Sequence, residues 1–185
     1  MTLSALPALA SCTPNNAAVG DTKSVSGHVG HDSVDKSDML IGVVAAGDED
    51  LDRTMLDAFK KVGIKAIYAS VPEGGTPLPG QSFKDMARRP VTAFVVDGLD
   101  MKSGQTNGWN QALQTARDAG IPVILINAVQ GPKDADLYAE LLRIVPTGNG
   151  KGSTGDGKGP VPFDQAVQAA INDNPHAKTM SVTLP

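Results

Sequence analysis

The sequence contains very little cysteine, few aromatic residues and no long apolar run. Cys12 is the single cysteine, which excludes an intramolecular disulfide and a cysteine-based zinc cluster. Aromatic residues make up 4% of the chain. No apolar stretch approaches the ~20 residues that span a bilayer. We therefore expect no membrane-spanning helix.

Positive charge is also scarce. The formal net charge is -4, and the lysines and arginines are scattered along the chain. Binding to a phosphate backbone requires a basic surface, so we expect no nucleic-acid partner. The length of 185 residues and the hydrophobic content of 41% are typical of one globular domain with tails.

The motifs of several enzyme classes are missing. Residues 45–50 contain one glycine and lack the dinucleotide-binding fingerprint. The glycine-rich stretch 148–152 is not a phosphate-binding loop, because it follows no clear strand and has no Gly-Lys-Ser/Thr ending placed before a helix. No serine stands in a Gly-x-Ser-x-Gly turn. His28 and His31 lie in a polar segment without further metal ligands. The sequence therefore predicts a protein that is not an enzyme and that holds no metal and no cofactor.

The N-terminal residues indicate a lipid anchor. Leu-Ala-Ser-Cys at residues 9–12 resembles a bacterial lipobox, in which the cysteine thiol receives a diacylglycerol group. We interpret residues 1–12 as a truncated lipoprotein signal and residues 13–38, which are polar and aperiodic, as a disordered tether. Lipidation of Cys12 would place the protein on the outer face of the cytoplasmic membrane, attached by the lipid alone.

Strand and helix patterns alternate through the remaining residues, 39–185. Continuous apolar runs predict strands at 39–45, 64–71, 91–97 and 121–127, and a three-to-four-residue apolar period predicts helices at 48–62, 81–89, 106–119 and 163–172. Residues 137–145 fit either period. This alternation is typical of an α/β fold with a doubly wound parallel sheet.

The C-terminal segment shows a different pattern. At 178–184, Met180, Val182 and Leu184 alternate with polar residues, which predicts an edge strand with one face in water. Residues 146–162 are rich in glycine and proline and predict a loop. We expect the apolar face of 178–184 to be covered, either by its own sheet or by the same strand of a second molecule in a homodimer through residues 178–184.

Candidate binding residues follow the expected strands. In a doubly wound sheet, ligands bind beyond the carboxyl ends of the strands, where Asp48, Asp97, Asp100 and Asn127 are expected. Carboxylate and amide groups suit a small neutral sugar better than a phosphate, since carboxylates repel phosphate. The alternative role of Asp48 is to cap a helix, and that of Asp97 is to begin a loop.

Four segments carry a resemblance to a known family. Residues 40–44, 93–100, 109–113 and 116–127 resemble the N-terminal lobe of periplasmic sugar-binding proteins of ABC transporters, of the ribose/galactose-binding type. The pattern Ala-x-x-Ala-Gly-Ile-Pro-Val in 116–127 is the most specific part. The resemblance implies a Rossmann-like lobe whose polar residues after the first, third and fourth strands contact sugar. It also implies that 163–184 leads into a second lobe.

The resulting hypothesis is a lipid-anchored, single-lobe solute-binding protein linked to carbohydrate uptake. Its expected partners are a weakly bound sugar, an ABC permease and a second binding lobe. A module that binds no ligand of its own and a truncated remnant of a two-lobed protein remain alternatives. A receiver-like cytoplasmic domain is less favoured, because Asn127 and Ala128 stand where that fold has a serine or threonine, and no clear lysine ends the fifth strand.

Overall fold

The computed structural model describes residues 33–46, 48–71, 78–102, 106–146 and 159–185. The lipobox, most of the expected tether and the glycine-rich stretch 148–152 lie outside the described residues. No helix in the described ranges is long and apolar enough to cross a membrane.

Within these ranges, seven parallel strands form one sheet in the order β2-β1-β3-β4-β5-β7-β6. The strands are β1 (Leu40–Ala45), β2 (Lys65–Ser70), β3 (Ala93–Asp97), β4 (Val123–Ile126), β5 (Glu140–Ile144), β6 (Val161–Pro162) and β7 (Thr179–Thr183). Residues 137–145, which fit a strand or a helix by sequence, are chiefly the strand β5, and the short 3-10 helix η2 (Ala135–Leu137) ends where this segment begins. The doubly wound parallel sheet expected from the alternating pattern is confirmed.

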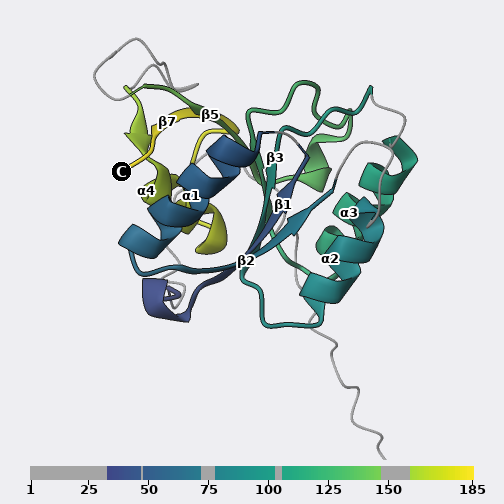
Figure 1. The fold of residues 1–185 in the computed structure, drawn as a ribbon, viewed down its shortest axis with the longest axis horizontal. Coiled ribbons are helices and arrows are strands. Elements are labelled where there is room, and N and C mark those ends of the chain that lie inside the picture. The colour runs from purple at the N-terminus through teal and green to yellow at the C-terminus, as the bar shows by residue number, and fades with distance from the viewer. Residues whose placement is uncertain (1–32, 47, 72–77, 103–105, 147–158) are drawn as a thin grey trace, which may run out of the picture.

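Helices cover both faces of this sheet (Figure 1). The helices are α1 (Glu49–Lys61), α2 (Pro79–Ala87), α3 (Thr106–Asp118) and α4 (Phe163–Ile171), with a 3-10 helix, η1 (Lys36–Asp38), before β1. Helices α1 and α4 lie on one face, and α2 and α3 lie on the other (Figure 1). We name these the α1–α4 face and the α2–α3 face.

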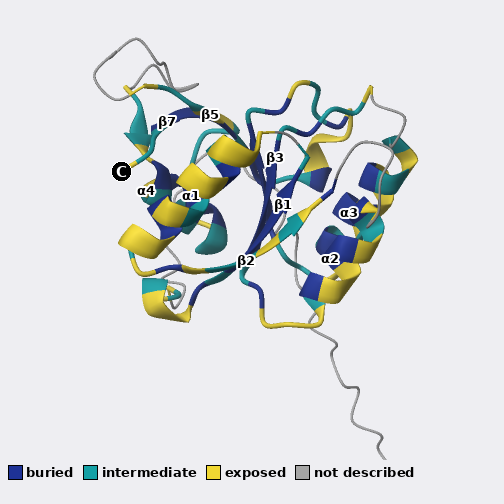
Figure 2. Cartoon of the chain, viewed as in Figure 1, coloured by how far each residue is buried: buried dark blue, intermediate teal, exposed yellow. Residues whose placement is uncertain are grey.

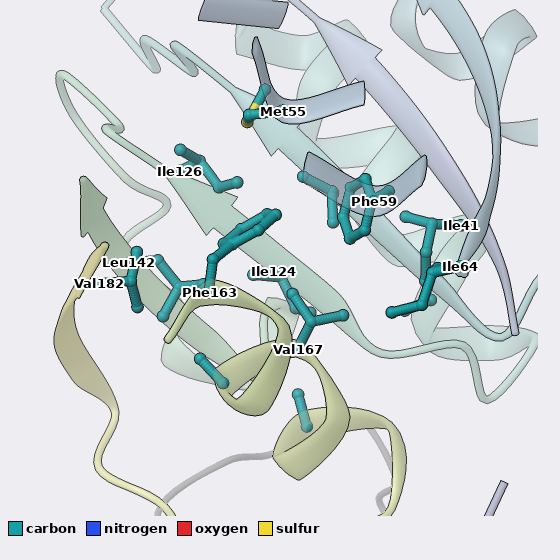
Figure 3. Packing of buried hydrophobic residues seen from close by; sticks show 14 of the residues in the cluster. Ile41, Met55, Phe59, Ile64, Ile124, Ile126, Leu142, Phe163, Val167 and Val182 are labelled. Atoms are coloured by element: carbon teal, nitrogen blue, oxygen red, sulfur yellow. The ribbon is translucent and has the colours of Figure 1, made fainter. Parts of the chain in front are cut away.

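The core of the α1–α4 face is centred on two phenylalanines (Figure 3). The rings of Phe59 and Phe163 lie 5.0 Å apart between their centroids. Ile124 and Ile126 of β4 project toward them from the sheet (Figure 3). Burial of such side chains contributes about 1.5–3 kcal/mol each, so α1 and α4 are held to the sheet chiefly by apolar packing.

The core of the α2–α3 face is more aromatic. Phe83 stacks on Phe94 at 4.3 Å and meets Trp109 edge-on at 6.5 Å. Gly42 of β1 lies under this cluster, where an added Cβ would approach Phe94 to 2.8 Å. The close approach of the Phe94 ring to the sheet therefore requires glycine at residue 42. Figure 2 shows the central strands β1 and β3 almost wholly buried, whereas β2 is partly exposed.

The C-terminal strand corrects one expectation. β7 is not the edge strand: it pairs with β5 on one side and with β6, the true edge, at Val182 and Thr183 on the other. Ser181, expected to face water, is 7% exposed. The apolar face of β7 is covered within its own chain by α4, so β7 and α4 extend this sheet rather than leading away from it. The homodimer through residues 178–184 stays a prediction.

The end of the expected tether also differs from its prediction. Residues 33–38 lie against α4 instead of forming disordered chain. The Val34 backbone N–H donates to the side-chain oxygen of Asn172 at 2.9 Å, and Lys36 pairs with Asp164 at 2.6 Å. Composition alone missed these contacts because both partners lie more than a hundred residues away in the sequence.

Candidate functional site

The strand order reverses between β1 and β3. From β1 the chain passes through α1 to β2 on one side, and then through α2 to β3 on the other. The carboxyl ends of β1 and β3 lie side by side, with Ala45 paired to Asp97, and the Ala46 N–H donates to the Asp97 carbonyl at 3.1 Å. This is the position at which doubly wound sheets bind ligands.

Asp97 occupies the centre of this position. Asp97 lies two and four residues after Val95 and Ala93, which belong to the core of the α1–α4 face, so its side chain points to that same face. The residue is 1% exposed, and its Oδ1 atom has no hydrogen-bond partner. Burial and, next, the negative charge of Asp52 raise the pKa of Asp97 to about 6. Asp97 is therefore a buried acid with spare hydrogen-bonding capacity.

Asp52 is the acidic residue of α1 whose charge acts on Asp97. It lies one turn into α1, is 3% exposed, and accepts a hydrogen bond from the Tyr68 hydroxyl at 2.9 Å through Oδ2. Its Oδ1 atom has no partner. Burial raises the pKa of Asp52, and the Tyr68 hydrogen bond opposes that rise. Helix α1, β2 and β3 thus bring Asp52, Tyr68 and Asp97 to one edge of the sheet.

Asp48 performs the capping role considered as its alternative. Its Oδ1 accepts from the N–H groups of Asp50 at 2.9 Å and Leu51 at 3.4 Å, which stabilises the first turn of α1. It also belongs to the cluster, since its charge raises the pKa of Asp97 and its backbone N–H lowers it. The structure therefore brings together Asp48 and Asp97 of the predicted residues.

The two other predicted residues lie on loops at the same edge. Asp100 accepts the Lys102 N–H at 2.8 Å and bridges in parallel to Gln130. Asn127 adopts a left-handed backbone, with φ of 47°, and its Oδ1 accepts the Ile144 N–H at 3.1 Å. Both side chains thus hold the loops that follow β3 and β4, and their role in ligand binding stays a prediction.

Asp52 and Tyr68 were missed as site residues by sequence reasoning. A signal was present for Asp52, which lies three residues before Met55 and seven before Phe59, on the same helical stripe. A carboxylate on the apolar stripe of a helix is expected to be buried. No comparable signal marks Tyr68, because only the pairing of β1 with β2 brings that strand against α1.

The carboxylates of Asp52 and Asp97 make this end of the sheet a place that accepts hydrogen bonds. Ionised carboxylates only accept, so the unpartnered atoms of Asp52 and Asp97 would be satisfied by hydroxyl or N–H donors of a ligand. Within the described residues, no three His, Cys, Asp or Glu side chains form a group that could hold a metal ion.

Comparisons with known proteins give distant likenesses. No family model and no curated protein matches the chain. Among solved structures, it is similar to the periplasmic binding protein component of the arabinose ABC transporter from Shewanella sp. ANA-3. Sequence identity is 15% and the TM-score 0.45, over 78% of this chain and 54% of that one. This chain thus spans about half the length of that protein.

A second likeness is to a pyridoxal-5'-phosphate-dependent protein from Escherichia coli. Sequence identity is 16% and the TM-score 0.35, over 57% of this chain and 28% of that one. Neither likeness is close enough to carry a function over to this chain.

Proposed function

We propose that this domain binds a small, neutral, polyhydroxylated solute at the carboxyl ends of β1 and β3. The observation that carries the proposal is the pair of buried carboxylate oxygens, Asp52 Oδ1 and Asp97 Oδ1, without hydrogen-bond partners at the strand-order reversal. A buried acceptor without a partner costs about 1–3 kcal/mol, and sugar hydroxyls would remove that cost. The sequence resemblance to sugar-binding lobes supports the same class of ligand.

The proposed setting is carbohydrate uptake outside the cytoplasm. Lipidation of Cys12 would attach the domain to the membrane, where an ABC permease or a second binding lobe would be its partner. A single lobe forms one wall of a cleft, so a bound sugar would keep part of its hydration. We expect dissociation constants no tighter than ~1 mM, equivalent to about -4 kcal/mol.

Calorimetric titration with a panel of neutral monosaccharides tests ligand binding. The wild-type chain should bind at least one of them in the millimolar range, and Asp97→Asn should weaken that binding tenfold or more. The matched control is Asp85→Asn on α2, which neutralises an exposed aspartate paired with Arg88. Two results contradict the proposal: no saccharide binds, or Asp97→Asn and Asp85→Asn bind equally well.

Membrane fractionation tests the anchor separately. The expressed wild-type chain should sediment with membranes and incorporate labelled palmitate, because the two chains of a diacylglycerol hold a protein stably where one does not. Cys12→Ala should release it into the soluble fraction, and Ser11→Thr serves as a neighbouring control. Equal sedimentation of wild type and Cys12→Ala would remove the lipid anchor from the proposal.

A further inference from the structure

A second group of buried polar atoms lies at the amino end of β5, whereas the candidate site lies at the carboxyl ends of the strands. Glu140 is the first residue of β5 and is 0% exposed. Both of its carboxylate oxygens lack hydrogen-bond partners, as does Nε2 of His176, which lies 3.8 Å from Glu140 Oε2. The His176 side chain is 6% exposed. Three unsatisfied atoms thus meet in one buried place.

The tautomer of His176 follows from its other ring nitrogen. Nδ1 lies 2.7 Å from the carbonyl oxygen of Asn174, and a carbonyl only accepts. Nδ1 therefore carries a proton, and in the neutral ring Nε2 presents a lone pair toward Glu140. A protonated Glu140 can donate to this lone pair, and a protonated Nε2 can donate to an ionised Glu140. The present separation of 3.8 Å is longer than a hydrogen bond, so either arrangement would require the two side chains to approach by about 1 Å, and either would then place one proton between them.

A cation and several apolar side chains lie close to the pair. Lys178, at the beginning of β7, faces Glu140 and donates to the carbonyls of Ala135 and Tyr138. The Tyr138 ring lies under the Lys178 ammonium, 4.1 Å from it. Strand β4 places Ile124 beside Glu140, and the buried residues of α4 are all apolar. Burial raises the pKa of Glu140 well above its ordinary value, although Lys178 opposes this.

We infer that Glu140 and His176 share one proton, and that this proton fastens the turn between α4 and β7 to the start of β5. When the pair loses the proton to solvent, it is left with an ionised, buried carboxylate facing a neutral ring. Lys178 offsets that charge only in part, because its ammonium is already engaged by two carbonyls. Mildly alkaline solution should then loosen α4 and β7, while β1 to β4 stay folded.

Hydrogen exchange on the full chain tests whether the proton of the Glu140–His176 pair stabilises α4 and β7. Rates are measured between pH 6 and pH 9 and corrected for the intrinsic pH dependence of amide exchange. In the wild type, protection of the β7 and α4 amides should fall at least tenfold over that range, and protection of β3 should change less than threefold. Equal falls in β7 and β3, or no fall, would overturn the inference.

Variants separate the pair from its neighbours. Glu140→Gln keeps the shape and supplies an amide N–H for Nε2, so its β7 protection should become independent of pH. Asp136→Asn, a matched change of an exposed carboxylate in η2, should behave as wild type. A pH-dependent loss of β7 protection in Glu140→Gln as large as that in wild type would overturn the inference.

Nitrogen NMR of histidine in the wild-type chain gives a readout without substitution. His176 should show a protonated Nδ1, and its Nε2 shift should change over the same pH range as the β7 protection. A bare Nδ1 would overturn the inference. So would an increase in thermal stability on adding zinc that Glu140→Gln abolishes, since the pair would then hold a metal and not a proton.

Discussion

The two faces of the sheet differ in what they bury. The α2–α3 face is closed by aromatic packing of Phe83, Phe94 and Trp109, and holds no buried carboxylate among the described residues. The α1–α4 face buries Asp52, Asp97 and Glu140 beside its apolar core. Apolar packing stabilises at every pH, whereas a buried carboxylate costs stability unless it is protonated or paired. The contrast indicates that the α2–α3 face serves folding and the α1–α4 face carries polar chemistry.

The largest expected effect is on the α2–α3 face. Phe94→Ala should lower the free energy of unfolding by about 3–5 kcal/mol, because it empties the space between Phe83 and the sheet. The loss should be the same at pH 5 and pH 8, since no charged group lies in that packing. Urea unfolding of wild type and variant measures it. A loss that changes by more than about 1 kcal/mol between the two pH values would break the comparison.

The next largest effect concerns Asp97 on the α1–α4 face. Its folded pKa of about 6 lies above the 3.8 of an exposed aspartate, so the folded state binds the proton more tightly. The contribution of Asp97 to the free energy of unfolding is therefore fully present below about pH 4 and is lost as the pH rises through 6. Asp97→Asn should be more stable than wild type at pH 7.5 by up to about 3 kcal/mol.

Urea unfolding of both proteins from pH 4 to pH 7.5 measures the effect of Asp97. The difference between them should shrink toward pH 4, and the exposed Asp85→Asn variant should show no such trend. A constant difference across this range would mean that Asp97 is no more difficult to ionise in the folded chain than in the unfolded one.

A smaller effect is expected where β1 meets the aromatic cluster. Gly42→Ala should cost about 1–3 kcal/mol, since its Cβ would lie 2.8 Å from the Phe94 ring and 3.1 Å from the Met86 sulfur. Gly159→Ala is the control, because an added Cβ there meets nothing within 4 Å. Thermal melts compare the two. Equal melting temperatures would show that the aromatic face yields more easily than its packing indicates.

The smallest expected effect is at the candidate site. Tyr68→Phe removes the hydrogen bond to Asp52 and should lower the free energy of unfolding by about 0.5–1.5 kcal/mol at pH 7. It should also raise the pKa of Asp52 further, because the hydroxyl now favours the ionised form. Carboxyl NMR titration of both proteins follows this shift. An unchanged pKa of Asp52 in Tyr68→Phe would mean that the Tyr68 hydroxyl does not stabilise the ionised form of Asp52.

Local sequence patterns determined most of the fold. The continuous apolar runs predicted β1, β3 and β4, and the helical stripes predicted α1, α3 and α4 to within a few residues. Because parallel strands present their carboxyl ends at one edge, the same patterns placed Asp48 and Asp97 together. These features depend on residues close in the sequence and on the rule that βαβ units wind in one hand.

Only the tertiary structure decided which side chains meet across distant segments. Tyr68 reaches Asp52 because β2 pairs beside β1, and His176 reaches Glu140 because β7 inserts between β5 and β6. The alternating pattern of 178–184 fitted an edge strand, but the two-residue β6 covers part of that edge and is too short to give a pattern of its own. Strand order and the pairing of buried polar groups depend on the free energy of the whole packed sheet, which no local window of sequence contains.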